Sequence, residues 1–110
     1  MKNLIVICLL ISPLALSAQK NKKTNFEVSG NCEMCKIRIE KAALNVKGLK
    51  AANWHIPSNI LSIVYNSEKV NLQKIQTAIA KVGHDTPLEK APDETYDKLP
   101  ICCIYKRNLE

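Results

Sequence analysis

The sequence predicts a small α+β domain in which two helices cover one face of a four-stranded antiparallel sheet. Segments with alternating apolar residues, the pattern of half-buried strands, interchange with segments whose apolar residues recur every three or four positions, the pattern of helices. Their order along the chain is β-α-β-β-α-β. With 110 residues, the chain can hold one such domain with additions at its ends.

The first 18 residues have the pattern of an export signal. Lys2 provides the positive start, residues 4–16 form an apolar run, and small residues at 15–18 predict cleavage after Ala18. The run is shorter than the roughly 20 residues that a membrane-spanning helix needs. We therefore expect a periplasmic or secreted mature protein without a stable membrane span. Residues 19–23 contain three lysines and are expected to form a disordered basic lead-in.

The first half of the domain should contain three strands and one helix. Residues 24–29 alternate as a strand with Phe26 and Val28 inward, and a helical stripe then runs from Cys35 until Gly48 ends it. Lys36 and Glu40 fall on the opposite, polar face. Residues 49–56 and 60–65 predict a hairpin around a turn at 57–59. Within it we assign Trp54 to the core and His55 to the surface. Ile37 and Leu44 lie off the apolar stripe of the helix and are interpreted as partly covered surface.

The second half should add one helix and an edge strand. Asn71 can cap a helix whose apolar stripe extends from residue 72 to 82, and Gly83 ends it. Residues 86–90 predict a last strand, which Pro87 confines to the edge of the sheet. The domain is therefore placed at 24–91, followed by a C-terminal extension at 92–110.

The cysteines form two close pairs. Cys8 leaves with the export signal, so Cys32, Cys35, Cys102 and Cys103 remain. An even number in an exported protein usually indicates disulfides. Here each pair would close only a tiny loop and remove little entropy from the unfolded chain, so we assign both pairs a chemical role.

The pair at Cys32 and Cys35 lies where the first strand gives way to the first helix. Two thiols at this spacing can bind one soft metal ion, and a helix N-terminus favours the thiolate. The same arrangement also serves redox-active pairs. A thiol–disulfide oxidoreductase is therefore the alternative function.

The predicted topology brings a histidine to this pair. Because successive elements alternate in direction, the connections at 30–35, 57–59 and 83–85 should share one end of the domain. His84 should then lie near the cysteine loop. It could be a third metal ligand or modulate the thiolates, and the alternative is a solvent-exposed histidine.

The element order and the cysteine position together resemble the heavy-metal-associated domain, a ferredoxin-like module of copper chaperones, copper-ATPase N-terminal domains and periplasmic mercury-binding proteins. The resemblance covers residues 25 to about 90. It is carried by Cys32-Glu33-Met34-Cys35 and by the segments 38–42, 46–49, 64–65 and 75–83.

The resemblance implies that Cys32 and Cys35 hold one soft ion and pass it on by thiolate exchange, without turning over a substrate. Cu(I) is the favoured ion, with Zn(II), Ag(I), Hg(II) and Cd(II) as alternatives. The implied partner is a metal-transporting or metal-accepting protein, and the implied form is a monomer or a metal-bridged dimer. The formal net charge of +6 is interpreted as a solvated cationic surface, the alternative being docking to an acidic protein or anionic lipid, and no nucleic acid is expected as a partner.

The sequence departs from the family pattern in the loop and beyond the domain. Gly30 and Asn31 precede Cys32 where the family has a methionine, whereas Met34 lies between the cysteines and could face metal or core. The ending that contains Cys102 and Cys103 resembles the Leu-Pro-x-Cys-Cys-x-Tyr ending of some exported bacterial members. These two thiols could join the first pair in a Cys₄-like site for Zn or a small copper cluster. They could also bind metal separately, pair with another chain, or form a disulfide with the first pair.

Overall fold

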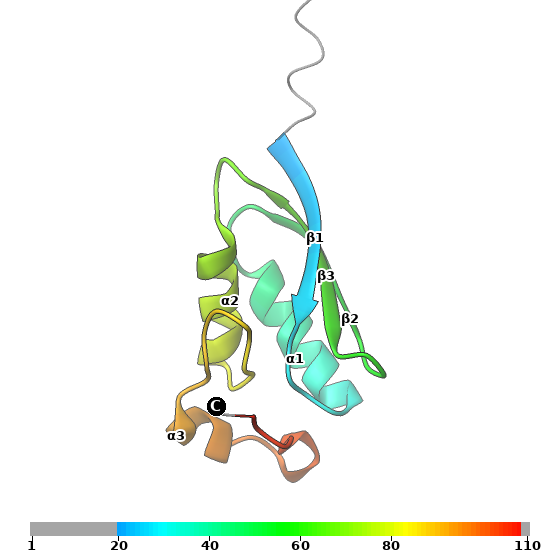
Figure 1. Cartoon of the computed structure of the whole chain (residues 1–110), viewed down its shortest axis with the longest axis vertical. Coiled ribbons are helices and arrows are strands. Elements are labelled where there is room, and N and C mark those ends of the chain that lie inside the picture. Colours follow the sequence, from blue (N-terminus) through cyan, green and yellow to red (C-terminus); the bar gives the residue numbers. More distant parts are fainter. Residues whose placement is uncertain (1–19, 109–110) are drawn as a thin grey trace, which may run out of the picture.

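The computed structural model describes residues 20–108, so the predicted export signal lies outside the described residues. Three strands form an antiparallel sheet of order β1-β3-β2, and two long helices lie on one face of it (Figure 1). The α+β prediction is confirmed. In the part of the chain that the structure describes, no helix is long and apolar enough to cross a membrane.

The strands are β1 (Asn21–Glu27), β2 (Leu49–His55) and β3 (Ile60–Asn66). β3 is central, and Leu61 lies opposite Phe26 of β1 and Trp54 of β2. β1 begins at Asn21, so the prediction of a disordered lead-in is wrong for residues 21–23. These residues pair with β3, which extends to Asn66, and exposed lysines are compatible with an edge strand.

The helices are α1 (Glu33–Leu44) and α2 (Leu72–Lys81). The predicted cap of α2 is confirmed, because the side chain of Asn71 accepts a hydrogen bond of 2.8 Å from the backbone N–H of Lys74. Gly83 follows α2 with φ +113°, a left-handed conformation that glycine adopts without strain. Ile37 and Leu44 of α1 lie on the surface, as expected, but both are exposed rather than partly covered.

The core lies between the sheet and the two helices. Trp54 is fully buried, which confirms its assignment, and its ring N–H donates to the backbone carbonyl of Val28 over 3.0 Å. Lys36 and Glu40 are only partly exposed and tie α1 to β2 rather than facing solvent. The ammonium of Lys36 lies 2.7 Å from Glu40 and 2.8 Å from the backbone carbonyl of Trp54. The largest fully buried side chains are those of Val28, Cys35, Ile39, Leu61, Ile63, Ile75, Ile79, His84, Thr86 and Cys103, together with Trp54.

The predicted fourth strand at 86–90 does not form. Thr86 instead closes a turn on Glu89: its backbone N–H and its hydroxyl both donate to the Glu89 carbonyl, over 2.9 and 2.8 Å. Pro87 has no N–H to give to a ladder, and the N–H of Leu88 is taken by the side chain of Gln76. The backbone donors of the segment are thus satisfied away from the sheet.

The C-terminal segment contains the short helices α3 (Asp93–Asp97) and η3 (Ile101–Cys103). It crosses the end of the domain where α1 begins (Figure 1). There it covers the connections that precede α1 and follow α2.

Candidate metal centre

Three loops meet at one end of the domain, as the topology predicts. The N–H of Val28 donates to the carbonyl of Asn59 over 2.8 Å, and the N–H of Ser29 donates to that of Asp85 over 3.0 Å. The Nδ1 atom of His84 lies 2.8 Å from the carbonyl of Ser29. The cysteine loop is therefore fixed from both sides by backbone contacts.

The first cysteine pair sits on the first turn of α1. Cys32 is the N-cap residue, and the Lys36 N–H donates to its carbonyl over 3.0 Å. The thiol sulfurs of Cys32 and Cys35 are 3.3 Å apart, Cys32 partly exposed and Cys35 fully buried. Asn31 brackets Cys35, since its backbone N–H and its side-chain oxygen each lie 3.5 Å from that sulfur.

The C-terminal pair folds back onto the first pair. The Sγ atom of Cys103 lies 3.3 Å from that of Cys32 and 3.9 Å from that of Cys102, and Cys102 lies 3.4 Å from the thioether of Met34. Five sulfur atoms are thus linked by successive contacts, and we call them the sulfur cluster. Their order is Cys35, Cys32, Cys103, Cys102 and Met34. Of the alternatives, the structure shows the fold-back onto the first pair, with the four cysteines at these positions free rather than bridged.

The spacing of the cluster fits one or more soft ions. For metal–sulfur bonds of about 2.3 Å, tetrahedral geometry places ligand sulfurs about 3.8 Å apart, and trigonal geometry about 4.0 Å. The sulfurs of Cys32, Cys102 and Cys103 all lie within 4.8 Å of one another. Small movements would bring them onto a common ion.

The thiols differ in their ease of ionisation. Burial raises the pKa of Cys32, but hydrogen bonds from the Cys35 backbone N–H and from neighbouring thiols outweigh it and lower the pKa to about 7. Burial raises the pKa of the Cys35 thiol to about 12. The hydrogen bond to Cys32 is the main cause that raises the pKa of Cys102, to about 11. Of these three thiols, Cys32 is therefore the one that ionises most readily.

Arg38 on α1 adds a positive charge behind the cluster. Its guanidinium donates to the sulfur of Cys103 over 3.3 Å and lies 3.5 Å from Nε2 of His84. The positive charge of Arg38 thus lies directly against the sulfur cluster. The sequence places Arg38 in a segment that resembles the family but indicates no role for it, because its neighbour Cys103 lies 65 positions away.

His84 is fully buried, so the expectation of a solvent-exposed histidine, the alternative to a ligand or modulating role, is wrong. Its ring stacks on Tyr105, with ring centroids 5.6 Å apart, and burial lowers its pKa to about 4. The residue is covered by the C-terminal segment, which carries no periodicity that would predict this. With both ring nitrogens against Ser29 and Arg38, His84 supports the cluster from behind.

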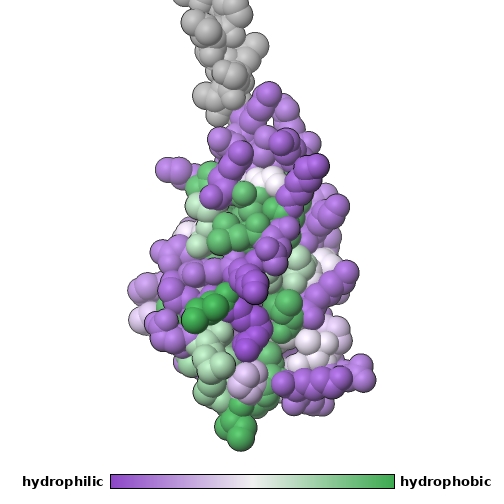
Figure 2. Space-filling view, turned by 180° about the vertical axis from the view of Figure 1, so that it is seen from behind, coloured by the Kyte–Doolittle hydropathy of each residue, from purple (hydrophilic) through white to green (hydrophobic). Residues whose placement is uncertain are grey.

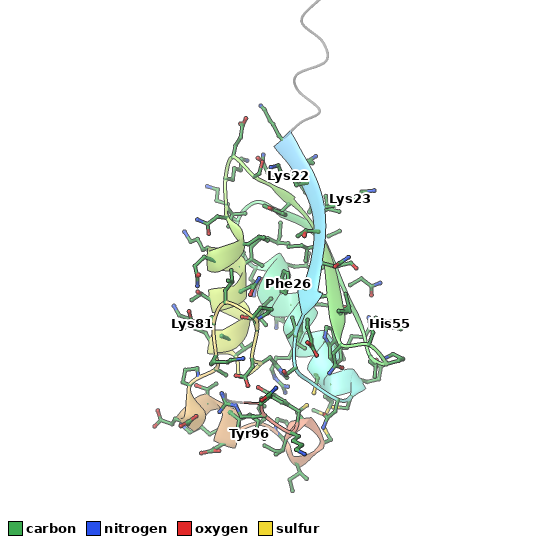
Figure 3. All side chains as sticks on the ribbon, in the orientation of Figure 1. Lys22, Lys23, Phe26, His55, Lys81 and Tyr96 are labelled. Atoms are coloured by element: carbon green, nitrogen blue, oxygen red, sulfur yellow. The ribbon has the colours of Figure 1, made fainter. Side chains whose placement is uncertain are left out.

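Tyr105 fastens the segment that carries Cys102 and Cys103. Its hydroxyl accepts from the backbone N–H of Asp85 over 3.0 Å and donates to the carbonyl of Gly83 over 2.7 Å. The hydroxyl of Tyr96 donates to the Tyr105 carbonyl. Figure 3 shows Tyr96 within the C-terminal segment and His55 at the outer edge of the sheet, which agrees with the assignment of His55 to the surface.

Arg107 completes this attachment. Its guanidinium makes two hydrogen bonds to the buried carboxylate of Asp85, at 2.7 and 2.9 Å, and one of 2.9 Å to Asp93. It also lies over the ring of Tyr96, 4.7 Å from the centroid. Although burial raises the pKa of Asp85, the bonds from Arg107 outweigh it and lower the pKa. We call Asp85, Tyr96, Tyr105 and Arg107 the tail clamp. From the sequence alone, Lys106 and Arg107 indicate only a positively charged C-terminal end.

The similar proteins found by sequence are copper proteins by name. A segment of 73 residues is 30% identical to the copper-exporting P-type ATPase of Bacillus subtilis, covering 66% of this chain and 9% of the ATPase. A segment of 55 residues is 29% identical to the copper chaperone CopZ of Staphylococcus epidermidis, covering 50% of this chain and 81% of CopZ. No protein-family model matches the chain.

The comparison of structures agrees with the comparison of sequences. A solved structure of a CopZ metallochaperone superposes with a TM-score of 0.57 at 27% identity, covering 59% of this chain and 98% of that one. The resemblance to the heavy-metal-associated domain is confirmed. The CopZ structure is matched over 98% of its length by 59% of this chain, whereas the sulfur cluster joins Cys32 to Cys103, which lie 71 positions apart in the sequence.

Proposed function

We propose that the chain is an exported soft-metal-binding protein that carries or sequesters Cu(I) and exchanges it with a partner. The observation that supports this proposal most directly is that the sulfur of Cys32 lies 3.3 Å both from that of Cys35 and from that of Cys103. A thiolate at the start of a helix with further soft donors around it is a ligand set for Cu(I) rather than for a hard cation. The copper chaperones and the copper ATPase among the similar proteins support this ion.

The sulfur cluster lies where a partner can reach it. Around it, Met34, Ile101 and Ile104 are 49%, 92% and 40% exposed. Hydrophobic side chains are visible at this end of the molecule in Figure 2. An apolar rim around the accessible thiols of Cys32 and Cys102 suits brief docking of a metal-accepting protein, and the ion would then move by stepwise thiolate exchange with no substrate turned over.

The test is an anaerobic titration of the reduced protein with Cu(I) against a competing chelator. We expect tight binding that is lost in Cys32→Ser/Cys35→Ser and a weaker response to Zn(II). If neither ion binds above the level of the double variant, the proposal is wrong.

Export is tested separately. The intact mass of the protein recovered from the periplasm identifies its N-terminal residue: a start at Gln19 is expected, and an intact leader would contradict export.

A thiol–disulfide oxidoreductase is the second candidate, and one observation favours it. A Cys32 thiol with a pKa lowered to about 7, paired with a buried Cys35, is the asymmetry that redox pairs use. The similar proteins and the third thiol beside Cys32 favour metal binding instead. Insulin reduction separates the two: turnover that depends on Cys32 would favour the oxidoreductase, and we expect no turnover above background.

A further inference from the structure

We propose that the sulfur cluster is a two-ion site, with a second Cu(I) position formed by Met34, Cys102 and Cys103 beside the position at Cys32 and Cys35. This inference rests on the proposed function and extends it from one ion to two. The contact between the Met34 thioether and the Cys102 thiol, at 3.4 Å, is the observation that carries it.

The number of donors fits two ions better than one. A single ion takes at most four of the five sulfurs in tetrahedral geometry. Two ions that each take three sulfurs need five atoms when one thiolate is shared. Cys103 is placed to be that thiolate, because its sulfur lies 3.3 Å from that of Cys32 and 3.9 Å from that of Cys102.

The two ends of the cluster differ in exposure and in chemistry. Cys35 is fully buried at one end, whereas Met34 is 49% exposed and Cys102 is exposed at the other. A thioether is a soft, uncharged ligand that suits Cu(I), whereas structural zinc sites use thiolates and imidazoles. The outer position is therefore specific for a soft monovalent ion.

The charges favour two monovalent cations. Four thiolates would gather beside Arg38, which donates a hydrogen bond to one of them, Cys103. One Cu(I) would leave excess negative charge in a partly buried space, and a second one offsets more of it. Met34 adds a donor without adding charge.

The experiment counts ions per chain. The full-length chain carrying Cys8→Ser, so that the leader contributes no thiol, is reduced, titrated anaerobically with Cu(I) under chelator competition and weighed by native mass spectrometry. We expect two Cu(I) bound to a monomer. Met34→Leu and Cys102→Ser change exposed side chains and should each reduce the count to one, whereas Ile37→Ser, which alters an exposed side chain of the same helix as Met34 without removing sulfur, should keep two.

The outcomes are distinguishable from those of the proposed function. One tightly bound ion that is unaffected by Met34→Leu and Cys102→Ser would overturn the two-ion site and leave the proposed function standing. Two ions per chain found only in a dimer would also overturn it, since the donors would then come from two molecules. No bound ion would overturn both proposals.

Discussion

At the scale of single residues, Arg38 joins two parts of the chain that the sequence keeps apart. Its guanidinium lies against the Cys103 sulfur on one side and the His84 ring on the other. The pair of cysteines at 32 and 35 could be predicted from spacing, whereas this contact could not. It depends on the fold of a segment without periodicity.

Replacing Arg38 by Gln should weaken Cu(I) binding. A hydrogen bond to a charged group contributes about 1.5–3 kcal/mol, and partial exposure of Arg38 places the effect near the lower value, about tenfold in affinity. Chelator competition measures it. Arg38→Lys, which keeps the charge, should lose less, and equal losses in both variants would show that charge is not the cause.

His84 should make stability depend on pH. Its pKa is lowered by burial from an ordinary value near 6.5 to about 4, so the unfolded chain binds the proton first as pH falls. The free energy of unfolding is then complete above pH 6.5 and decreases between pH 6.5 and 4, by at most about 3 kcal/mol. Denaturant unfolding of the metal-free protein at several pH values measures this slope.

The matched variants are His84→Phe and His55→Gln. Phenylalanine keeps a ring against Tyr105 but cannot titrate, so the decrease in this pH range should largely disappear. His55 is exposed, and its variant should behave as the unsubstituted chain does. An unchanged slope in His84→Phe would assign the pH dependence to another group. Asp85 is not that group, because its lowered pKa places its titration below this range.

At the scale of elements, the tail clamp decides whether the second thiol pair reaches the first. η3 has only three residues, of which only Cys103 is buried, and Tyr105 and Arg107 hold it in place from the C-terminal side. The same segment explains two prediction errors. It covers His84, and Arg107 and the Ala91 N–H engage Asp85 just where the predicted fourth strand would start.

Arg107→Gln should loosen the tail while leaving the sheet intact. The substitution leaves the buried Asp85 carboxylate without its cation, and breaking a buried pair in this way costs about 3–5 kcal/mol. We expect amide hydrogen exchange in residues 99–105 to rise at least a hundredfold and Cys103 to become accessible to alkylation. Amides of β3 should keep their exchange rates.

Lys106→Gln is the matched control, since Lys106 is the exposed neighbour of Arg107. It should leave both exchange and alkylation unchanged. A faster exchange throughout β3 in Arg107→Gln would mean that the clamp stabilises the whole domain instead of the tail.

At the scale of the whole molecule, the element order was enough to predict which loops meet. Because strand and helix directions alternate, His84 and the cysteine loop are expected at the same end of the domain. The contact between His84 and the Ser29 carbonyl confirms this placement. The fourth strand was predicted from a single apolar residue, Leu88, and turn formation at Thr86 outweighed that weak pattern. Nothing in residues 92–108 has the periodicity that would predict its path.

The architecture therefore combines a two-thiol loop that sequence can identify with a tail that only the structure places. A domain of this kind with Cys32 and Cys35 alone would offer an ion two thiolates. The tail adds at least one more at 3.3 Å from Cys32, and under the proposed function the higher ligand number should retain Cu(I) more tightly.

X-ray absorption at the copper edge, with one equivalent of Cu(I) bound to the reduced protein, tests this claim most directly. The structure predicts three sulfur ligands, falling to two in Cys102→Ser/Cys103→Ser. Two sulfur ligands in the unsubstituted protein, unchanged by that double substitution, would show that the tail thiols do not bind the ion.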